Sequence, residues 1–266
     1  MDSDILKVGI ILSIALYLVY WVSGQRKKWK IPKVKFPEAW RRILQQKVTY
    51  YQTLDEEGQK LFEYKVQEFL LNCQITGVET SVALVDRILI AASAVIPIFA
   101  FPKWKYKNLD EVLLYPRMFS EDFRTQGEGR NILGMVGNGY MERKMILCKQ
   151  ALHLGFKNET DKRNTAIHEF IHLIDKMDGQ VDGIPKVLLE KQYVIPWVDM
   201  IEQKIEEIVD KKSDIHPYAK TSRIEFFAVL GEYFFERPKL LRKKHPELYT
   251  ILEQIFDQDL ALKKNN

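Results

Sequence analysis

The sequence has few cysteines, no internal repeat, no low-complexity tract and no glycine motif of the kind that cradles phosphate groups. Its two cysteines, Cys73 and Cys148, lie too far apart to indicate a disulfide framework, and neither belongs to a CxxC pair. This cysteine content is typical of a protein in a reducing compartment.

The chain also lacks a strong excess of charge, with 40 Lys+Arg against 36 Asp+Glu and a formal net charge of +4. The basic excess is concentrated in one short stretch. Its members are Arg26, Lys27, Lys28, Lys30, Lys33 and Lys35. Because the rest of the chain is then close to neutral, we expect no direct binding of nucleic acid.

A length of 266 residues with 46% hydrophobic residues allows one substantial core. We predict one domain with an appendage. Residues 1–35 would form an N-terminal transmembrane anchor and a basic linker, and residues 36–266 the folded domain.

The segment Ile5 to Val22 is predominantly apolar and, at about 18 residues, near the lower limit for spanning a bilayer. An acidic start and the lack of a convincing cleavage site argue against a signal peptide. We therefore predict an uncleaved, single-pass membrane anchor. The basic residues that follow it place the folded domain in the cytoplasm by the positive-inside rule. An amphipathic helix on the membrane surface is the alternative.

Apolar periodicity and start signals predict three helices in the first and last parts of the domain. Thr53-Leu54-Asp55-Glu56 resembles a capping box that opens a helix to about Asn72. The apolar run Ile88 to Phe101 contains Pro97 and is short for a bilayer, so it predicts a buried core helix that ends near Pro97. A second transmembrane span is the alternative. Trp197 to Lys212 has an amphipathic pattern with a charged, solvated face.

Two of the five histidines lie in one motif, His168-Glu169-Phe170-Ile171-His172, within a helical apolar pattern. Side chains four residues apart lie on one helix face, so both rings can reach one metal ion. Glu169 projects about 100° round the helix, where it can hold the metal's water without ligating the metal. The motif predicts a zinc hydrolase site. The alternative is two hydrogen-bonded core histidines, but the apolar rows around them favour a cation, because buried polar groups need partners.

Two strands are predicted before the motif. Glu111 to Tyr115 has a strand pattern that Pro116 stops, and the glycine-rich residues 127–139 indicate a loop or a bent hairpin. Lys144 to Leu154 is apolar enough for a strand directly before the motif helix. In zinc peptidases a strand in that place lines the cleft and pairs with an extended substrate. A plain core strand is the alternative.

The motif supplies two ligands, and a zinc hydrolase needs a third. Glu225 lies in Ile224 to Phe235, whose apolar density predicts a buried helix, and a carboxylate in such surroundings needs a cation. Tyr218, seven residues upstream, is a phenol that can donate to an oxyanion. Glu232, seven residues downstream on the same helix face, can orient a ligand.

Asp178 is the competing third ligand, in a turn-rich loop six residues after His172. Some zincins place a ligand there, but they need a helix-breaking glycine where this chain has Asp175, so Glu225 is preferred. Asp175 can instead accept a hydrogen bond from a ligand histidine. A structural zinc site with four protein ligands is a further alternative, although the sequence offers no evident fourth ligand.

Several sequence blocks are spread from about Phe36 to Phe256, namely FPEAW, LIAASAVIP, LLYPRMF, HEFIHLID, HPYAK and EFFAVLGEYFFERP. Together they resemble the Mlc titration factor A family of zinc-dependent peptidases. The resemblance implies an α+β fold, a mainly helical zincin-like domain with a small β-sheet, similar to the catalytic core of anthrax lethal factor.

The resemblance also implies roles for single residues. His168, His172 and Glu225 resemble the Zn²⁺ ligands, Glu169 the catalytic base and Tyr218 the donor to the transition state. A peptide or protein would be the substrate, and aminopeptidase action is one form that the reaction can take.

Two functions follow from the resemblance, because well-known family members are associated with binding a sugar-responsive transcriptional repressor as well as with peptide hydrolysis. Our leading hypothesis is a membrane-anchored zinc metallopeptidase that faces the cytoplasm. The alternative is a regulator-binding module that sequesters a transcriptional repressor, with hydrolysis secondary. The enzyme is favoured because a pure binder has no need to keep Glu169 and Tyr218 beside the ligands.

Overall fold

The computed structural model describes residues 29–158 and 160–262. By its contacts the chain divides into two units, Met1–Ile31 and Pro32–Asn266, and the described helices and strands belong to the second. Across these described residues, no helix combines the length and the apolar character needed to cross a bilayer. The predicted anchor from Ile5 to Val22 falls outside the described residues and stays a prediction.

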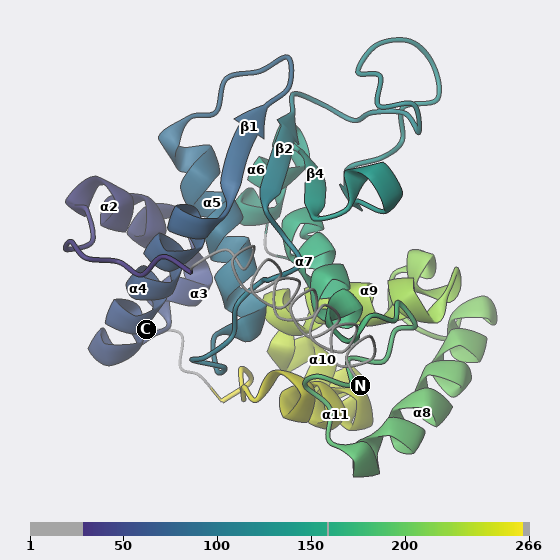
Figure 1. Ribbon diagram of the computed structural model, residues 1–266. Helices are drawn as coiled ribbons and strands as arrows, with labels where there is room; N and C mark the ends of the chain where they lie inside the picture. Colours follow the sequence, from purple (N-terminus) through teal and green to yellow (C-terminus); the bar gives the residue numbers. More distant parts are fainter. Residues whose placement is uncertain (1–28, 159, 263–266) are drawn as a thin grey trace, which may run out of the picture. The chain divides into compact units, whose positions relative to one another are not determined.

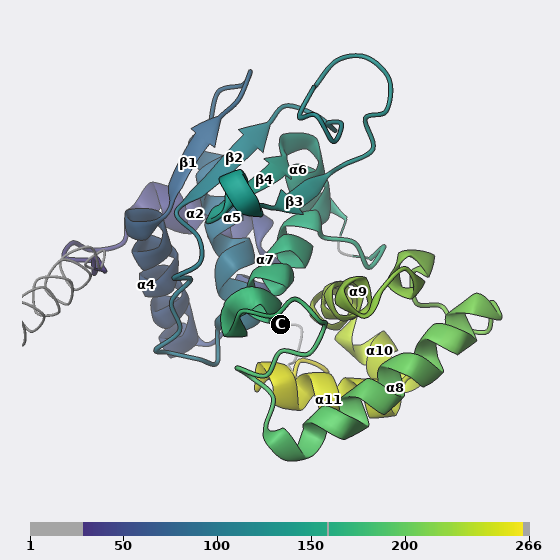
Figure 2. The same cartoon turned by 45° about the vertical axis from the view of Figure 1, so that its right-hand side comes forward.

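A four-stranded sheet with the order β1-β2-β4-β3 forms one layer of the fold; Figure 1 labels β1, β2 and β4, and Figure 2 labels β3 as well. Strands β1 (Gln74–Gly77), β2 (Glu111–Tyr115) and β4 (Lys144–Cys148) are parallel, and β3 (Gly134–Val136) pairs antiparallel with β4. The predicted strand at Glu111–Tyr115 is confirmed. The glycine-rich segment forms a hairpin with β4, and its strand β3 is an edge of the sheet.

The described helices up to and including the motif helix lie on one face of the sheet (Figure 2). They are α2 (Glu38–Lys47), α3 (Thr49–Gln52), α4 (Glu56–Asn72), α5 (Leu84–Val95), α6 (Lys149–Lys157) and α7 (Thr165–Asp175). The α5 helix contacts α2, α4, α6 and α7. It buries Ile88, Leu89 and Ile90 almost completely and passes into a 3-10 turn at Ile96–Ile98. The predicted buried core helix near Pro97 is therefore confirmed.

The C-terminal part of the chain packs against α7. It contains α8 (Lys191–Val209), the 3-10 helix η4 (Pro217–Lys220), α9 (Arg223–Glu236), α10 (Pro238–Lys244) and α11 (Pro246–Phe256). An aromatic core joins these helices, with Trp197 of α8 against Phe227 of α9 and Phe227 stacked on Phe256 at a ring distance of 6.0 Å. This packing sets α9 beside α7, and these two helices carry the predicted ligands.

The other face of the sheet carries a smaller apolar cluster, in which Tyr115, Phe119 and Ile146 are buried. Phe123 and Ile132, from the segment between β2 and β3, pack against it. The sheet is thus covered on both faces, and β3 is positioned by packing from two sides.

Two helix starts differ from the prediction. The side chain of Asp55 caps α4 by accepting the N–H of Gly58 at 2.8 Å, whereas Thr53 belongs to the end of α3. The α8 helix begins at Lys191, ahead of Trp197, and contains Pro196. Pro196 therefore lies inside the helix, where it removes one backbone hydrogen bond, and does not mark the helix start.

The predicted strand from Lys144 to Leu154 is only half strand, because β4 ends at Cys148 and α6 follows at once. The reason is visible in the packing. Lys149 and His153, one helical turn apart, both contact Asp86, at 2.8 and 2.6 Å. In addition, β4 lies between β2 and β3, so it is a core strand and cannot pair with a substrate. The free edge at this side of the sheet belongs to β3.

Candidate metal centre and catalytic site

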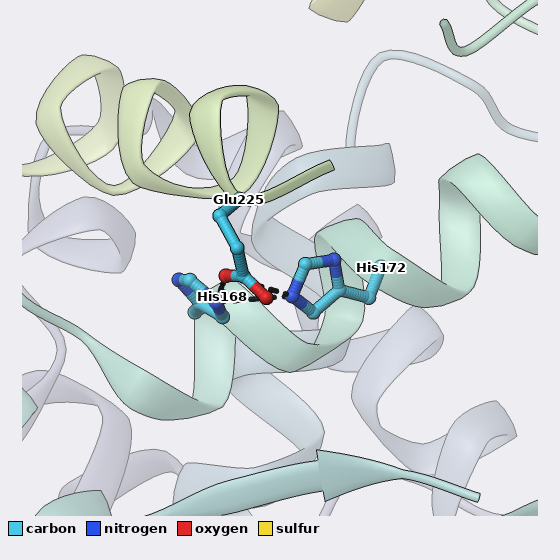
Figure 3. A group of neighbouring side chains, drawn as sticks. All are labelled: His168, His172 and Glu225. Atoms are coloured by element: carbon cyan, nitrogen blue, oxygen red, sulfur yellow. Dashed lines mark hydrogen bonds and ion pairs between the residues drawn. The ribbon is translucent and has the colours of Figure 1, made fainter. Parts of the chain in front are cut away.

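The α7 helix is fixed in rotation by its cap and its apolar face. Asn164 caps it by accepting the N–H of Ile167 at 3.2 Å, and Phe170, Ile171 and Ile174 are completely buried. The remaining face therefore turns toward α9. Figure 3 shows the rings of His168 and His172 directed at a side chain that descends from α9.

That side chain is Glu225, in the first turn of α9, where the cap Ser222 accepts its N–H at 3.1 Å. Its Oε2 lies 3.0 Å from Nε2 of His168 and 3.5 Å from Nε2 of His172, and the two Nε2 atoms are 3.0 Å apart. Among the described residues these three form a group of possible metal ligands, with all ligand atoms within 4.8 Å of one another. The structure thus brings the three predicted ligands together.

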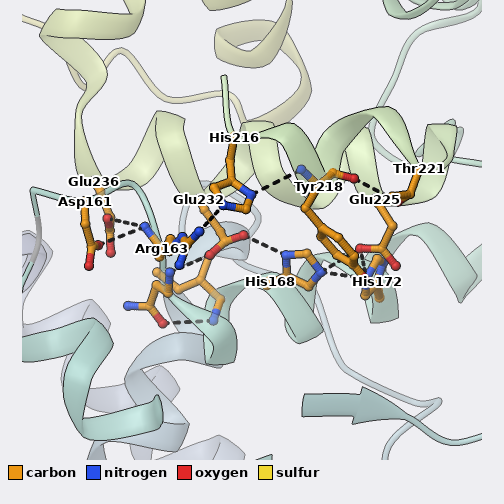
Figure 4. A network of polar contacts seen from close by, with 12 residues as sticks. Asp161, Arg163, His168, His172, His216, Tyr218, Thr221, Glu225, Glu232 and Glu236 are labelled. Atoms are coloured by element: carbon orange, nitrogen blue, oxygen red, sulfur yellow. Dashed lines mark hydrogen bonds and ion pairs between the residues drawn. The ribbon is translucent and has the colours of Figure 1, made fainter. Parts of the chain in front are cut away.

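Glu232 holds the ring of His168 from the side opposite Glu225 (Figure 4). Oε1 of Glu232 lies 2.7 Å from Nδ1 of His168, and Oε2 accepts the N–H of Asn164 at 2.5 Å. Because a carboxylate only accepts, Nδ1 donates to Glu232, and Nε2 is the ring nitrogen that would hold a metal. The spacing of Glu225 and Glu232 predicted that Glu232 would contact a ligand residue, and its contact with His168 is that contact.

The donor set suits a divalent cation. Nε2 of His168, Nε2 of His172 and Oε2 of Glu225 lie 3.0 to 3.5 Å from one another, and a divalent cation would replace the protons that these atoms share. Burial raises the pKa of Glu225, but hydrogen bonds from the two histidines outweigh it and hold that pKa well below its usual range. Two imidazoles and one ionised carboxylate are a ligand set typical of catalytic zinc.

Glu169 lies on the same helix but takes no part in the ligand group. Its side chain is buried, with 5% of the residue exposed, and burial is the main cause that raises its pKa. Strand β3 passes directly over it. A Cβ added to Gly134 would lie 2.6 Å from both Cγ and Oε1 of Glu169, so only glycine allows this approach.

Tyr218 approaches the ligand group from η4. Its ring centroid lies 6.2 Å from that of His168, and the residue is 48% exposed. Burial of the phenol, and then the nearby carboxylate of Glu225, raise the pKa of Tyr218 to about 12. Tyr218 is therefore a neutral hydrogen-bond donor at neutral pH.

These side chains line one cavity of about 460 Å³ between β3, α7 and the start of α9. Its polar wall holds His168, His172, Glu225 and Glu169, and Tyr218 lines it as well. Val136, Val181 and Ile224 are among its apolar residues. A second cavity of about 420 Å³, near Phe156 and Phe235, has no group of metal ligands, so the chemistry points to the first.

Asp178 is not part of the ligand group, because its Oδ1 accepts the N–H of Gln180 at 2.9 Å within its own loop. The suggested hydrogen bond between Asp175 and a ligand histidine is not formed. Oδ2 of Asp175 accepts the N–H of Gly183 at 3.0 Å. Oδ1 of Asp175 and Nδ1 of His172 are both buried without a hydrogen-bond partner in the described part of the chain.

Sequence reasoning missed two contributors to the site, Gly134 and Lys176. The Nζ of Lys176, just past α7, donates to the carbonyl of Gly137 at 3.0 Å and to Asn138 at 2.8 Å, and so ties the end of β3 to the motif helix. The glycine-rich residues 127–139 did indicate a bent hairpin, and β3 with Gly134 is the strand of that hairpin. Nothing in the spacing of Lys176 indicated its partners.

Comparison with protein families decides what kind of protein carries this site. A family model described as glucose-regulated metallo-peptidase M90 matches residues 22–257. The chain belongs to this metallopeptidase family. An uncharacterized protein of Synechocystis sp. is similar, with 26% identity over 267 residues that cover 94% of this chain and 97% of the relative.

Two further relatives carry the name Mlc titration factor A. The protein of Pectobacterium atrosepticum is 27% identical over 219 residues, which cover 77% of this chain and 80% of the relative. That of Escherichia fergusonii is 30% identical over 174 residues, 59% of this chain and 62% of the relative. The resemblance to the Mlc titration factor A family is thereby confirmed, and membership of a metallopeptidase family implies a metal in the protein.

Proposed function

We propose that the chain is a zinc-dependent peptidase in which His168, His172 and Glu225 hold the metal. The observation that carries the proposal is the convergence of these three side chains beside a buried glutamate, Glu169, in one cavity. Zn²⁺ in a site with three protein ligands lowers the pKa of a water molecule to about 7 and polarises a carbonyl group. The family assignment supports a metal-dependent peptidase in general.

Glu169 is proposed as the base. Its buried carboxylate with a raised pKa lies beside the ligand group, where it can take a proton from the attacking water. It then gives this proton to the amine that leaves. Burial suits both steps, because a raised pKa makes the carboxylate a better proton acceptor and a better store for the proton between them.

Tyr218 is proposed as the donor to the oxyanion that forms when water adds to the carbonyl. Its phenol keeps its proton at neutral pH, since its pKa is raised to about 12. A donor aimed at charge that develops only in the transition state raises kcat more than it raises substrate affinity. Glu232 would hold His168 in the tautomer that leaves Nε2 free.

The substrate is proposed to lie along β3. This strand is an edge of the sheet and lines the cavity with Gly134, Met135 and Val136. An extended peptide can add to such an edge through its backbone, which brings a peptide bond past Glu169. Pairing with the substrate, which was first expected of the strand that begins at Lys144, is thus assigned to the neighbouring strand β3.

The test is metal analysis of the purified full-length chain together with hydrolysis of peptide and aminoacyl chromogenic substrates. We expect about one zinc per chain in the wild type and in Glu169→Gln, with turnover only in the wild type. His168→Ala and Glu225→Ala should lose the metal. Zinc retained in Glu225→Ala but lost in Asp178→Ala would show that the third ligand is wrong.

A second candidate function is the binding of a transcriptional regulator, favoured by the name Mlc titration factor A of the relatives. Glu169→Gln separates the two functions in cells. If binding is the main role, this variant keeps the cellular phenotype that deletion of the domain removes. Equal loss in both strains contradicts the binding module.

We also propose that residues 5–22 anchor the protein in the membrane with residues 36–266 in the cytoplasm. The support is the apolar run and the basic residues after it, with Arg26 the first of these. A membrane-bound peptidase of this orientation meets substrates at the inner surface of the membrane.

A further inference from the structure

The proposed donor Tyr218 lies on an element that cannot hold itself in place. The η4 helix has four residues, Pro217–Lys220, and 3-10 turns of this length have little stability of their own. Its local support includes two backbone bonds, from the N–H of Ala219 to the carbonyl of His216 at 3.0 Å and from the N–H of Thr221 to the carbonyl of Tyr218 at 3.1 Å. A cap in which His216 Nδ1 accepts the N–H of Tyr218 at 3.3 Å adds to them. Its position must therefore come from outside.

Asp214, four residues before Tyr218, gathers several of the side-chain contacts that anchor the segment leading into η4. Its Oδ2 accepts from the hydroxyl of Tyr233 at 2.8 Å and lies 3.2 Å from Nζ of Lys162 and 3.1 Å from Nζ of Lys244. Its Oδ1 lies 2.8 Å from Nε2 of His245. One carboxylate thus joins α9, α10 and the loop before α7 to the segment that leads into η4.

The hydrogen bonds and ion pairs of the Asp214 carboxylate are strong. Burial alone would raise the pKa of Asp214, but hydrogen bonds from His245, Tyr233, Lys244 and Lys162 outweigh it and hold the pKa well below its usual range. Asp214 is therefore ionised at neutral pH, and its side chain is only 24% exposed. Ile215, three residues before Tyr218, and Ala219, directly after it, add to the anchoring because both are buried.

Given the role proposed above for Tyr218, we infer that Asp214 is a positioning residue that holds η4, and with it the Tyr218 hydroxyl, against the metal-binding helices α7 and α9. It contacts neither the ligand group nor the cavity in the described structure. Its effect on the reaction passes through Tyr218 alone. This predicts a particular coupling between the two residues.

The experiment is a double-mutant cycle of Asp214→Asn and Tyr218→Phe in the zinc-loaded full-length chain. Alone, Asp214→Asn should lower kcat by about 10- to 100-fold, since a small misplacement of a catalytic group costs that much, while zinc content and KM stay unchanged. In the Tyr218→Phe background it should cause no further loss of kcat, because the donor is already gone. Independent, multiplying losses would overturn the inference.

Asp86→Asn is the matched control. Asp86 is a buried carboxylate with a lysine and a histidine as partners, but it joins α5 to α6. It should lower stability without coupling to Tyr218. Tyr233→Phe is a milder variant of the tested contact, since it removes one hydroxyl from Asp214 and keeps the buried ring. It should give a smaller loss of kcat that is again absent in the Tyr218→Phe background.

Hydrogen exchange provides a readout that does not depend on peptidase activity. The amides of Tyr218, Ala219 and Thr221 should exchange at least about tenfold faster in Asp214→Asn than in the wild type, and at the wild-type rate in Asp86→Asn. Unchanged exchange in Asp214→Asn would overturn the inference even if the chain hydrolyses peptides. Faster exchange in a chain without peptidase activity would keep the structural role and reject the proposed function.

Discussion

Gly134 and Glu169 lie so close that a methyl group on the glycine would come within 2.6 Å of the glutamate side chain. The edge strand and the proposed base therefore share one space. In Gly134→Ala either β3 or the carboxylate must move, and a shift of about 1 Å at a catalytic group costs roughly 100-fold in rate. We expect kcat to fall by about this factor with zinc retained, as measured by steady-state kinetics and metal analysis.

Gly139→Ala is the control for the Gly134 variant. Gly139 has a φ of +57°, but a Cβ there meets nothing within 4 Å. The substitution should lower the free energy of unfolding by about 1 kcal/mol through backbone strain and leave kcat unchanged. Loss of zinc in Gly134→Ala would contradict the contact with Glu169 as the cause.

Glu232→Gln tests the support of His168. The amide can no longer accept with full charge from Nδ1, so the ring loses the partner that fixes its tautomer. Zinc affinity should fall by about 10- to 100-fold, measured by competition with a chelator. The control is Glu236→Gln, one turn further along α9, whose carboxylate accepts the N–H of Arg163 at 2.8 Å. Equal affinity in both variants would rule out the assigned role of Glu232.

Tyr218→Phe should keep zinc and lower kcat by about 10² to 10³, with KM little changed, because a donor to an oxyanion acts mainly in the transition state. Half of the residue is exposed, so the loss of the hydroxyl should not destabilise the fold. Steady-state kinetics with one peptide substrate measures both constants. A rise in KM at constant kcat would mean that Tyr218 only binds the substrate.

The Asp86 carboxylate predicts part of the acid sensitivity of the fold. Burial raises its pKa, but hydrogen bonds from Lys149, His153 and the Ala83 N–H outweigh it and lower the pKa below its ordinary value. Its contribution is then complete above the unfolded pKa of about 3.9 and is lost as pH falls through the lower folded value. Urea unfolding should show this loss in the wild type, and a shallower acid dependence in Asp86→Asn.

The proposed topology predicts that a reporter fused to the C-terminus behaves as cytoplasmic, because the basic residues that begin at Arg26 stay inside. A reporter that is active only outside the cytoplasm would reverse the orientation. A mature chain that begins near Gly24 would replace the anchor with a cleaved signal. The same fusions to a chain that starts at Phe36 measure how much residues 1–35 contribute to membrane attachment of the reporter.

Much of the site was predictable because its signals are local in sequence. His168 and His172 are one helical turn apart, and Glu232 follows Glu225 by two turns, so helical spacing alone placed each pair on one face. Glu225 was accessible through a different signal, a carboxylate in an apolar helix. These predictions needed no knowledge of which elements pack together.

The parts that the sequence left open depend on contacts between distant segments. Whether Lys149 continues a strand or begins a helix is decided by the contacts of Lys149 and His153 with Asp86. Asp86 and His153 are 67 residues apart, so no local pattern in the sequence reveals this contact. Likewise, the choice of β3 as the edge strand follows from its pairing with β4. Short apolar runs are ambiguous between strand and helix until such partners are known.

The separation of the ligands along the chain has a consequence for biosynthesis. His168 and Glu225 are 57 residues apart, and Glu225 stands on a helix whose packing includes α11 at the C-terminal end. Domains fold as the chain emerges from the ribosome, N-terminal part first. A growing chain can therefore present both histidines before the glutamate arrives, so the complete ligand set forms only after α9 has been made and has packed against α7. Proteolytic capacity would thus be withheld from the nascent chain.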